Sequence, residues 1–62
     1  MWRKWKVGDR VIYIVNEFDG HGTFEGIVTE MHESHAIVEA DVFHVHERLW
    51  LDDNTQDKFW HR

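Results

Sequence analysis

The sequence predicts an all-β fold, a small barrel of four to five antiparallel strands. Three observations support this prediction: short runs of β-branched and aromatic residues, a spacing of roughly ten residues between these runs, and glycine-bearing turns in the first half of the chain. Closure of such strands into a barrel would remove exposed edges. The chain has 62 residues, enough for one domain. It begins with methionine, and we expect a complete small gene product.

The first two strands are predicted on either side of a loop. The segment RVIYIV at 10–15 is β-branched and aromatic without helical spacing, which indicates a strand. The polar, glycine-bearing segment 16–22 is predicted to be a mobile loop. A second strand is predicted at 23–31, and Gly26 in its middle suggests a bulge or a sharp bend.

The next two strands are predicted to follow a short hairpin connection at 32–35. In the third strand, 36–41, the small apolar side chains alternate and are expected to face the core. These core-facing residues are Ala36, Val38 and Ala40. A tight turn near 40–42 is expected to lead into the fourth strand at 42–47.

The C-terminal part is predicted to close the fold. Residues 48–51 are expected to form a single 3₁₀ turn followed by a short closing strand. The tail either packs Phe59 and Trp60 onto the barrel or forms a short helix with Asp53 or Asn54 as its N-cap. The expected organisation is a basic aromatic arm at 1–6, a barrel at 7–52 and a packing tail at 53–62.

Composition excludes several classes of protein. The chain has no cysteine, so disulfides and thiolate zinc sites are excluded, and the setting is expected to be cytoplasmic. No apolar run approaches the ~20 residues that a membrane-spanning helix needs, and we expect no membrane partner. Nine aromatic side chains supply the bulk that so small a core requires.

Charge is unevenly distributed along the chain. Residues 1–10 hold four cations and one carboxylate, a net charge of +3. Residues 11–57 hold one arginine and eleven carboxylates, a net charge of −10. Such a charge distribution gives information about binding partners rather than about the fold. The acidic majority of the chain disfavours an extensive contact with DNA. The acidic surface is either a docking surface for a basic protein patch or an ordinary solvated face.

The pattern VGDRVIYI followed by GHGTFEGIVTEM resembles the opening of SH3-like and Tudor-like small barrels. It is distantly similar to the RNA-polymerase-interacting domain of CarD-like regulators and transcription-repair coupling factors. The positions that carry this resemblance are Gly8, Asp9, Val11, Tyr13, His21, Gly22, Gly26 and Ile27. The resemblance covers about residues 7–51, and related barrels occur among ribosomal and phage-encoded proteins. It implies an SH3-like barrel that binds a protein or a nucleic acid. The chain has no counterpart of the helical DNA-binding domain of CarD-like proteins.

The histidines are weak candidates for a metal site. His44 and His46 are two apart on a predicted strand and would share a face. If the third and fourth strands pair, His35 could approach His46, with His32 nearby. Such imidazoles with a glutamate could bind zinc, nickel or copper. The alternative, which we favour, is surface histidines beside carboxylates, with no metal and no cofactor.

Catalysis is not expected. Ser34 lies between Glu33 and His35, but neighbours in a tight turn rarely present a nucleophile to its base. A barrel of this size offers no deep pocket that excludes water. We therefore expect a binding module rather than an enzyme.

The leading functional hypothesis is a protein-binding accessory module that docks on transcription or other nucleic-acid machinery, RNA polymerase among them. Exposed aromatic side chains surrounded by carboxylates would form its contact. The candidate residues are Phe18, Trp50, Trp60, Glu39, Asp41 and Glu47. Homodimerisation through a strand edge would compensate for the small core.

The alternative is direct nucleic-acid binding by the N-terminal arm, in which aromatic and basic residues alternate. Its candidate residues are Trp2, Arg3, Lys4, Trp5, Lys6 and Arg10. A competing interpretation makes Trp2 and Trp5 a clamp over the open end of the barrel. One of the arm's cations would then lie over Trp50 or Trp60.

Overall fold

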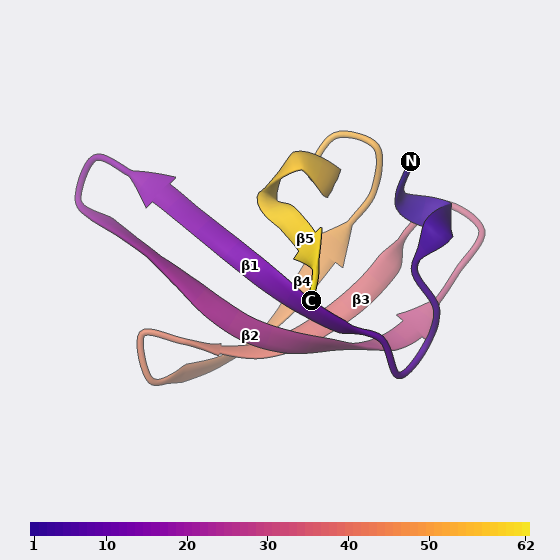
Figure 1. Cartoon of the computed structure of the whole chain (residues 1–62), viewed down its shortest axis with the longest axis horizontal. Helices are drawn as coiled ribbons and strands as arrows, with labels where there is room; N and C mark the ends of the chain where they lie inside the picture. Colours follow the sequence, from indigo (N-terminus) through magenta and orange to yellow (C-terminus); the bar gives the residue numbers. More distant parts are fainter.

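The computed structural model describes all 62 residues as one curved sheet of five antiparallel strands (Figure 1). The strands are β1 (Arg10–Glu17), β2 (Gly20–Met31), β3 (Ala36–Val42), β4 (Val45–Leu51) and β5 (Phe59–His61). Two 3₁₀ turns, η1 (Trp2–Lys4) and η2 (Gln56–Lys58), complete the fold. The prediction of an all-β fold with four to five antiparallel strands and a C-terminal 3₁₀ turn is confirmed. None of the helical turns has the length and apolar character needed to span a membrane.

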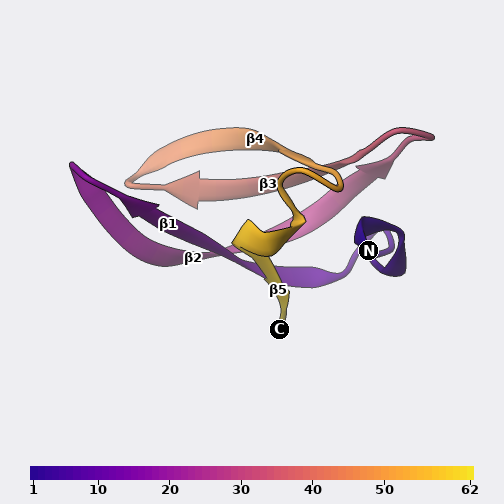
Figure 2. The same ribbon diagram turned by 90° about the horizontal axis from the view of Figure 1, so that it is seen from above.

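The sheet curls into a half-open barrel. The strand order is β4-β3-β2-β1-β5, so β4 and β5 are its two edges and no ladder joins them. Viewed from above, β3 and β4 form one layer, β1 and β5 lie in the other, and the long β2 runs between them (Figure 2). The register between β2 and β3 shifts between Val28 and Glu30, which increases the local bend of β2.

The core lies between these layers and is closed by the N-terminal segment. Trp2 and Trp5 are 3% and 2% exposed and pack with valine and leucine side chains from the strands. Arg3 anchors the segment by donating to the carbonyl of Glu33, at 2.7 Å. Phe59 of β5 joins the same cluster. This arrangement agrees with the interpretation of Trp2 and Trp5 as a clamp.

The core face of β3 was predicted correctly. Ala36, Val38 and Ala40 are all buried. They lie opposite Leu51, Leu49 and Glu47 of β4. Alternation of small apolar residues therefore identified the inner face of this strand.

The connection between β1 and β2 is a tight hairpin, so the prediction of a mobile loop at 16–22 is wrong. Pairing continues to Glu17 opposite Gly20, and only Phe18 and Asp19 form the turn. Polar side chains at the end of a hairpin face solvent and leave backbone pairing intact. The polar composition of this segment indicates that its side chains are exposed, but it does not determine the backbone conformation.

The turn between β3 and β4 also differs from the prediction. It is formed by Phe43 and His44, with φ of 51° and 68°, and not by residues 40–42. Left-handed conformations at both central positions allow a two-residue hairpin turn, but Gly, Asn and Asp usually occupy them. Because His44 is in the turn, it does not share a strand face with His46.

Strand β4 continues through Leu51, so the predicted 3₁₀ turn at 48–51 is wrong. The C-terminal 3₁₀ turn is η2, and its N-cap is Thr55 rather than Asp53 or Asn54. The carboxylate of Asp52 accepts hydrogen bonds from the backbone N–H groups of Asn54 and Thr55, which stabilises the preceding turn. Strand β5 then pairs with β1, with Trp60 opposite Ile12.

Gly26 is needed for close approach of β2 and β3 rather than for a bulge. A Cβ at this position would lie 2.9 Å from Cγ1 of Val38 and 3.0 Å from the carbonyl oxygen of Glu39. At Gly20, a Cβ would meet only the ring of Phe43, at 3.5 Å. The two glycines therefore provide a matched comparison.

We expect Gly26→Ala to lower the free energy of unfolding by about 1–3 kcal/mol, because the neighbouring strand cannot move without strain. Gly20→Ala is expected to change it by no more than about 0.5 kcal/mol. Urea unfolding of the two variants measures the difference. Equal stability of both variants would contradict the close packing of β2 on β3.

Candidate functional site

The candidate site is the outer face, defined as the side chains of β1–β4 that point away from the core. Strand alternation and register assign them. They include Arg10, Ile12, Glu25, Ile27, Glu39, Asp41, His46, Arg48 and Trp50. One cross-strand row shows the arrangement: Arg10 lies opposite Ile27, which lies opposite Glu39. The outer face therefore combines apolar and charged side chains.

Ion pairs connect the strands across the outer face. Glu25 pairs with Arg10 at 2.7 Å and with Arg62 at 2.6 Å. On the same face, nearer β4, Glu30 pairs with Arg48. These pairs are exposed, and each contributes modestly to stability. Their main effect is to fix the positions of the carboxylates.

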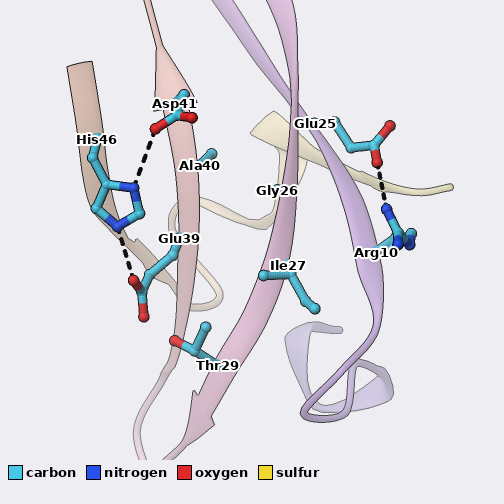
Figure 3. Close-up of a pocket in the computed structure, with 9 residues that line it drawn as sticks. All are labelled: Arg10, Glu25, Gly26, Ile27, Thr29, Glu39, Ala40, Asp41 and His46. Carbon is cyan, nitrogen blue, oxygen red and sulfur yellow. Dashed lines mark hydrogen bonds and ion pairs between the residues drawn. The ribbon is translucent and has the colours of Figure 1, made fainter. Parts of the chain in front are cut away.

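His46 lies between two carboxylates. Its Nε2 is 2.8 Å from Glu39, and its Nδ1 is 3.2 Å from Asp41 (Figure 3). Only the protonated imidazole can donate from both nitrogens. The hydrogen bonds to Glu39 and Asp41 therefore raise the pKa of His46. The hydrogen bond from His46 likewise lowers the pKa of Glu39.

A shallow groove of about 360 Å³ runs across the outer face. Its lining residues are Arg10, Glu25, Gly26, Ile27, Thr29, Glu39, Ala40, Asp41 and His46 (Figure 3). Ile27 is 41% exposed and, with Gly26 and Ala40, gives the groove an apolar part. Three carboxylates line the groove against one arginine and one histidine. Because Arg62 also pairs with Glu25, these groups carry a net negative charge while His46 is neutral and none when His46 is protonated.

The candidate protein-binding residues do not all come together. Glu39 and Asp41 line the groove, and Trp50 shares the outer face with them. Phe18 is isolated at the tip of the β1–β2 hairpin. Glu47 lies opposite the buried Ala40 and points to the other side of the sheet.

The two exposed tryptophans are on opposite edge strands. Trp60 lies on β5 and Trp50 on β4, at the two ends of the strand order. The predicted aromatic contact of Phe18, Trp50 and Trp60 is thus three separate features. Trp60 lies opposite Ile12 and so faces the same way as Trp50, but the width of the sheet lies between them.

Trp50 is held by its neighbours. Its ring stacks on His35 with a centroid distance of 3.4 Å, and His35 stacks in turn on His32 at 4.8 Å. The indole Nε1 donates to Asp52 at 2.8 Å. Desolvation acts to raise the pKa of Asp52, but hydrogen bonds from Asn54, Trp50 and Thr55 lower it overall. Trp50 is therefore a fixed, half-covered aromatic surface.

The N-terminal tryptophans are not available for stacking on bases. Both indoles are buried. The guanidinium of Arg3 lies 4.8 Å from the ring centroid of Trp2, and Nζ of Lys4 lies 4.6 Å from that of Trp5. The predicted cation–π contact with Trp50 or Trp60 is therefore replaced by contacts within the arm. Lys6 lies beside the same segment, in the turn that leads to Asp9.

The structure does not bring the candidate histidines together. His35 contacts Trp50 near the β2–β3 connection, whereas His46 lies toward the opposite end of the β3–β4 hairpin. No three or more His, Asp or Glu side chains are grouped so that they could hold a metal ion. The expected approach of His35 to His46 is therefore wrong, because the hairpin register separates them.

Five groove residues were not among the candidate site residues from the sequence: Glu25, Gly26, Ile27, Thr29 and Ala40. His46 was considered only as a weak metal candidate. The alternation of Glu25 and Ile27 along β2 does indicate one exposed face. Their position opposite Arg10 and Glu39 depends on strand register, which the sequence leaves open.

Comparison of the chain with protein-family models, with curated proteins and with solved structures finds no match. The function is therefore inferred from the site's own residues.

We expect the contribution of His46 to stability to depend on pH. Its raised pKa gives stability that is fully present below the unfolded-state pKa of about 6.5 and is lost as pH rises through the folded-state pKa. The lowered pKa of Glu39 gives stability that is present above its unfolded-state pKa and lost in acid.

The difference in stability between the wild type and His46→Gln should therefore be largest between about pH 5 and 6.5 and small at pH 8. Urea unfolding at pH 5.5 and 8 measures this difference. A difference that is the same at both pH values would show that the bridge between Glu39 and Asp41 is not ionic.

Proposed function

We propose that the protein is a non-enzymatic protein-binding module, and that the groove of the outer face contacts a basic surface of its partner. The observation that carries this proposal is the convergence of Glu25, Glu39 and Asp41 around the exposed side chain of Ile27. A partner lysine or arginine can lay its aliphatic stem on Ile27 while its charged end meets the carboxylates.

The charges of the groove support a basic partner. Arg10 and His46 neutralise part of the carboxylate charge and hold the carboxylates in place. The negative charge that remains while His46 is neutral would attract a cationic surface and accelerate encounter. Trp50, 52% exposed on the same face, adds an aromatic side chain of the kind that often dominates interface energies.

The form of the groove favours contact over chemistry. Its ionisable side chains are paired with one another across the strands, and the groove is shallow. A catalytic site usually needs a more enclosed cavity from which water can be excluded. A surface that is charged, apolar in part and open suits a macromolecular partner.

The proposed partner class is transcription or other nucleic-acid machinery. Proteins of such machinery carry basic surfaces that complement an acidic groove. The distant resemblance to polymerase-interacting barrels supports the same class. Contact through the groove would leave both hairpin tips and β5 free.

We expect the double variant Ile27→Ser with Asp41→Asn to lose partner binding while remaining folded, since both side chains are substantially exposed. Affinity capture from the lysate of the source cells, followed by mass spectrometry, should show proteins that the wild type retains and the variant does not. Raised salt should weaken their retention.

The matched control is Glu47→Gln, which removes a carboxylate from the other side of the sheet. It should retain the same proteins as the wild type. If the groove variant and the wild type retain identical proteins, or if neither retains any at low salt, the proposal fails.

A further inference from the structure

Trp60 has surroundings unlike those of Trp50. It is 64% exposed on β5, the edge strand opposite β4. Lys4, Phe59, Trp60 and His61 line an open depression of about 320 Å³ beside it. His61 stacks on the buried Trp5 at 4.6 Å, which fixes β5 against the N-terminal segment. An exposed indole and an ammonium group therefore share one small surface.

Four cations lack an ionic partner, and three of them belong to the N-terminal segment that borders this surface. Three of the seven lysine and arginine side chains, Arg10, Arg48 and Arg62, pair with carboxylates. The other four, Arg3, Lys4, Lys6 and Lys58, have no carboxylate within ion-pair distance. Lys4 lines the depression itself, and the turn that contains Lys6 places Asp9 beside His61, at 3.6 Å. Lys58 lines other hollows, one with Glu17 and Asp57 and one with Trp50.

The carboxylates near β5 do not cancel this charge. Asp9 accepts the backbone N–H of Lys6 and lies beside His61, and Glu25 is shared by two arginines. Asp57 has no ionic partner and lines a hollow with Lys58.

Two further acidic residues, Glu17 and Asp19, lie at or beside the tip of the β1–β2 hairpin. Glu17 lines a hollow with Lys58 and Asp57, and it is not among the residues around Lys4 and Trp60.

We propose that the surface formed by Lys4, Trp60 and His61 binds single-stranded nucleic acid. A base stacks on the exposed indole of Trp60, and the adjoining phosphates lie near the ammonium groups. The cations Arg3 and Lys6 extend the positive surface along the N-terminal segment. Duplex DNA fits less well, because its bases are not free to stack on a single exposed ring.

This surface shares no lining residue with the groove, although Trp60 lies opposite Ile12 and is therefore on the same face of the sheet. The groove is lined from β1 to β4, whereas the proposed nucleic-acid surface is built on β5 and the N-terminal segment. A module that holds a basic protein on one surface and a single strand on another would bridge the two. Each half of this arrangement is tested by its own variants.

The experiment measures fluorescence anisotropy of a labelled ten-nucleotide oligo(dT) titrated with the full chain at 20 and 200 mM salt. Wild type should bind at low salt and weaken as salt rises, with a slope of about −0.7 per phosphate contacted. Trp60→Ala should weaken binding at least about fivefold, within the range expected for loss of one stacked base. Trp60→Phe should recover part of the affinity because phenyl rings also stack.

The matched control is Trp50→Ala, which removes an indole of similar exposure on the opposite edge. It should leave the affinity for oligo(dT) unchanged. The double variant Lys4→Ala with Lys6→Ala should reduce both the affinity and the salt slope. The groove variant Ile27→Ser with Asp41→Asn should bind oligo(dT) like the wild type, which separates this inference from the proposed protein contact.

No anisotropy change at 20 mM salt with the wild type overturns the inference. Equal losses in Trp60→Ala and Trp50→Ala overturn it as well, as does equal binding of a duplex of the same length. The unfolding midpoint of each variant, followed by circular dichroism, shows that it is folded. If Trp60→Ala does not fold, Trp60→Phe and the double lysine variant decide the question by the same titration.

Discussion

Burial of Trp2 and Trp5 is the interaction on which the rest of the structure depends. The sheet is half open, and its last strand has only three residues. Two indoles fill the end of the core that this short strand leaves uncovered. Burying one such ring contributes about 4–6 kcal/mol before entropic costs, from ~150–250 Å² at ~25 cal/mol per Å². Whole domains are stable by only about 5–15 kcal/mol, so these two side chains decide whether the fold forms. Nε1 of Trp5 has no acceptor, and the apolar burial outweighs that cost of about 1–3 kcal/mol.

The same burial determines which side chains are left for recognition. With the N-terminal indoles in the core and their neighbouring cations lying over them, Trp50 and Trp60 are the exposed tryptophans. They occupy opposite edges in different electrostatic surroundings. Trp50 lies beside histidines and Asp52, whereas Trp60 lies beside Lys4 and His61. Carboxylates are anchored across the outer face by arginines and His46, and free cations remain near the termini. A small chain of net charge −5 can therefore present both an acidic and a basic surface.

The presence of the strands could be predicted from the sequence, because the alternation of side chains along a strand is a local signal. The inner row Ala36, Val38 and Ala40 followed from it directly. The β3–β4 turn could not be located from the sequence, because Phe43 and His44 adopt left-handed conformations that these residue types do not indicate. Because of that error, the predicted fourth strand began too early, and His44 and His46 were placed on one strand face.

The groove was beyond prediction for a related reason. Contacts such as that between Arg10 and Glu25 depend on strand register, which becomes known only when the turns are placed. Glu39, Asp41 and Trp50 were proposed as recognition residues from their type, and the structure assigns them to one face.

The division of the four tryptophans between core and surface is the central claim, and ¹⁹F NMR of the 5-fluorotryptophan-labelled protein tests it most directly. A soluble gadolinium chelate broadens resonances of side chains that reach solvent, and single Trp→Phe variants assign the four signals. The structure predicts that Trp50 and Trp60 broaden strongly while Trp2 and Trp5 stay sharp. Strong broadening of Trp5, or a protected Trp60, would contradict both the core and the two recognition surfaces inferred from it.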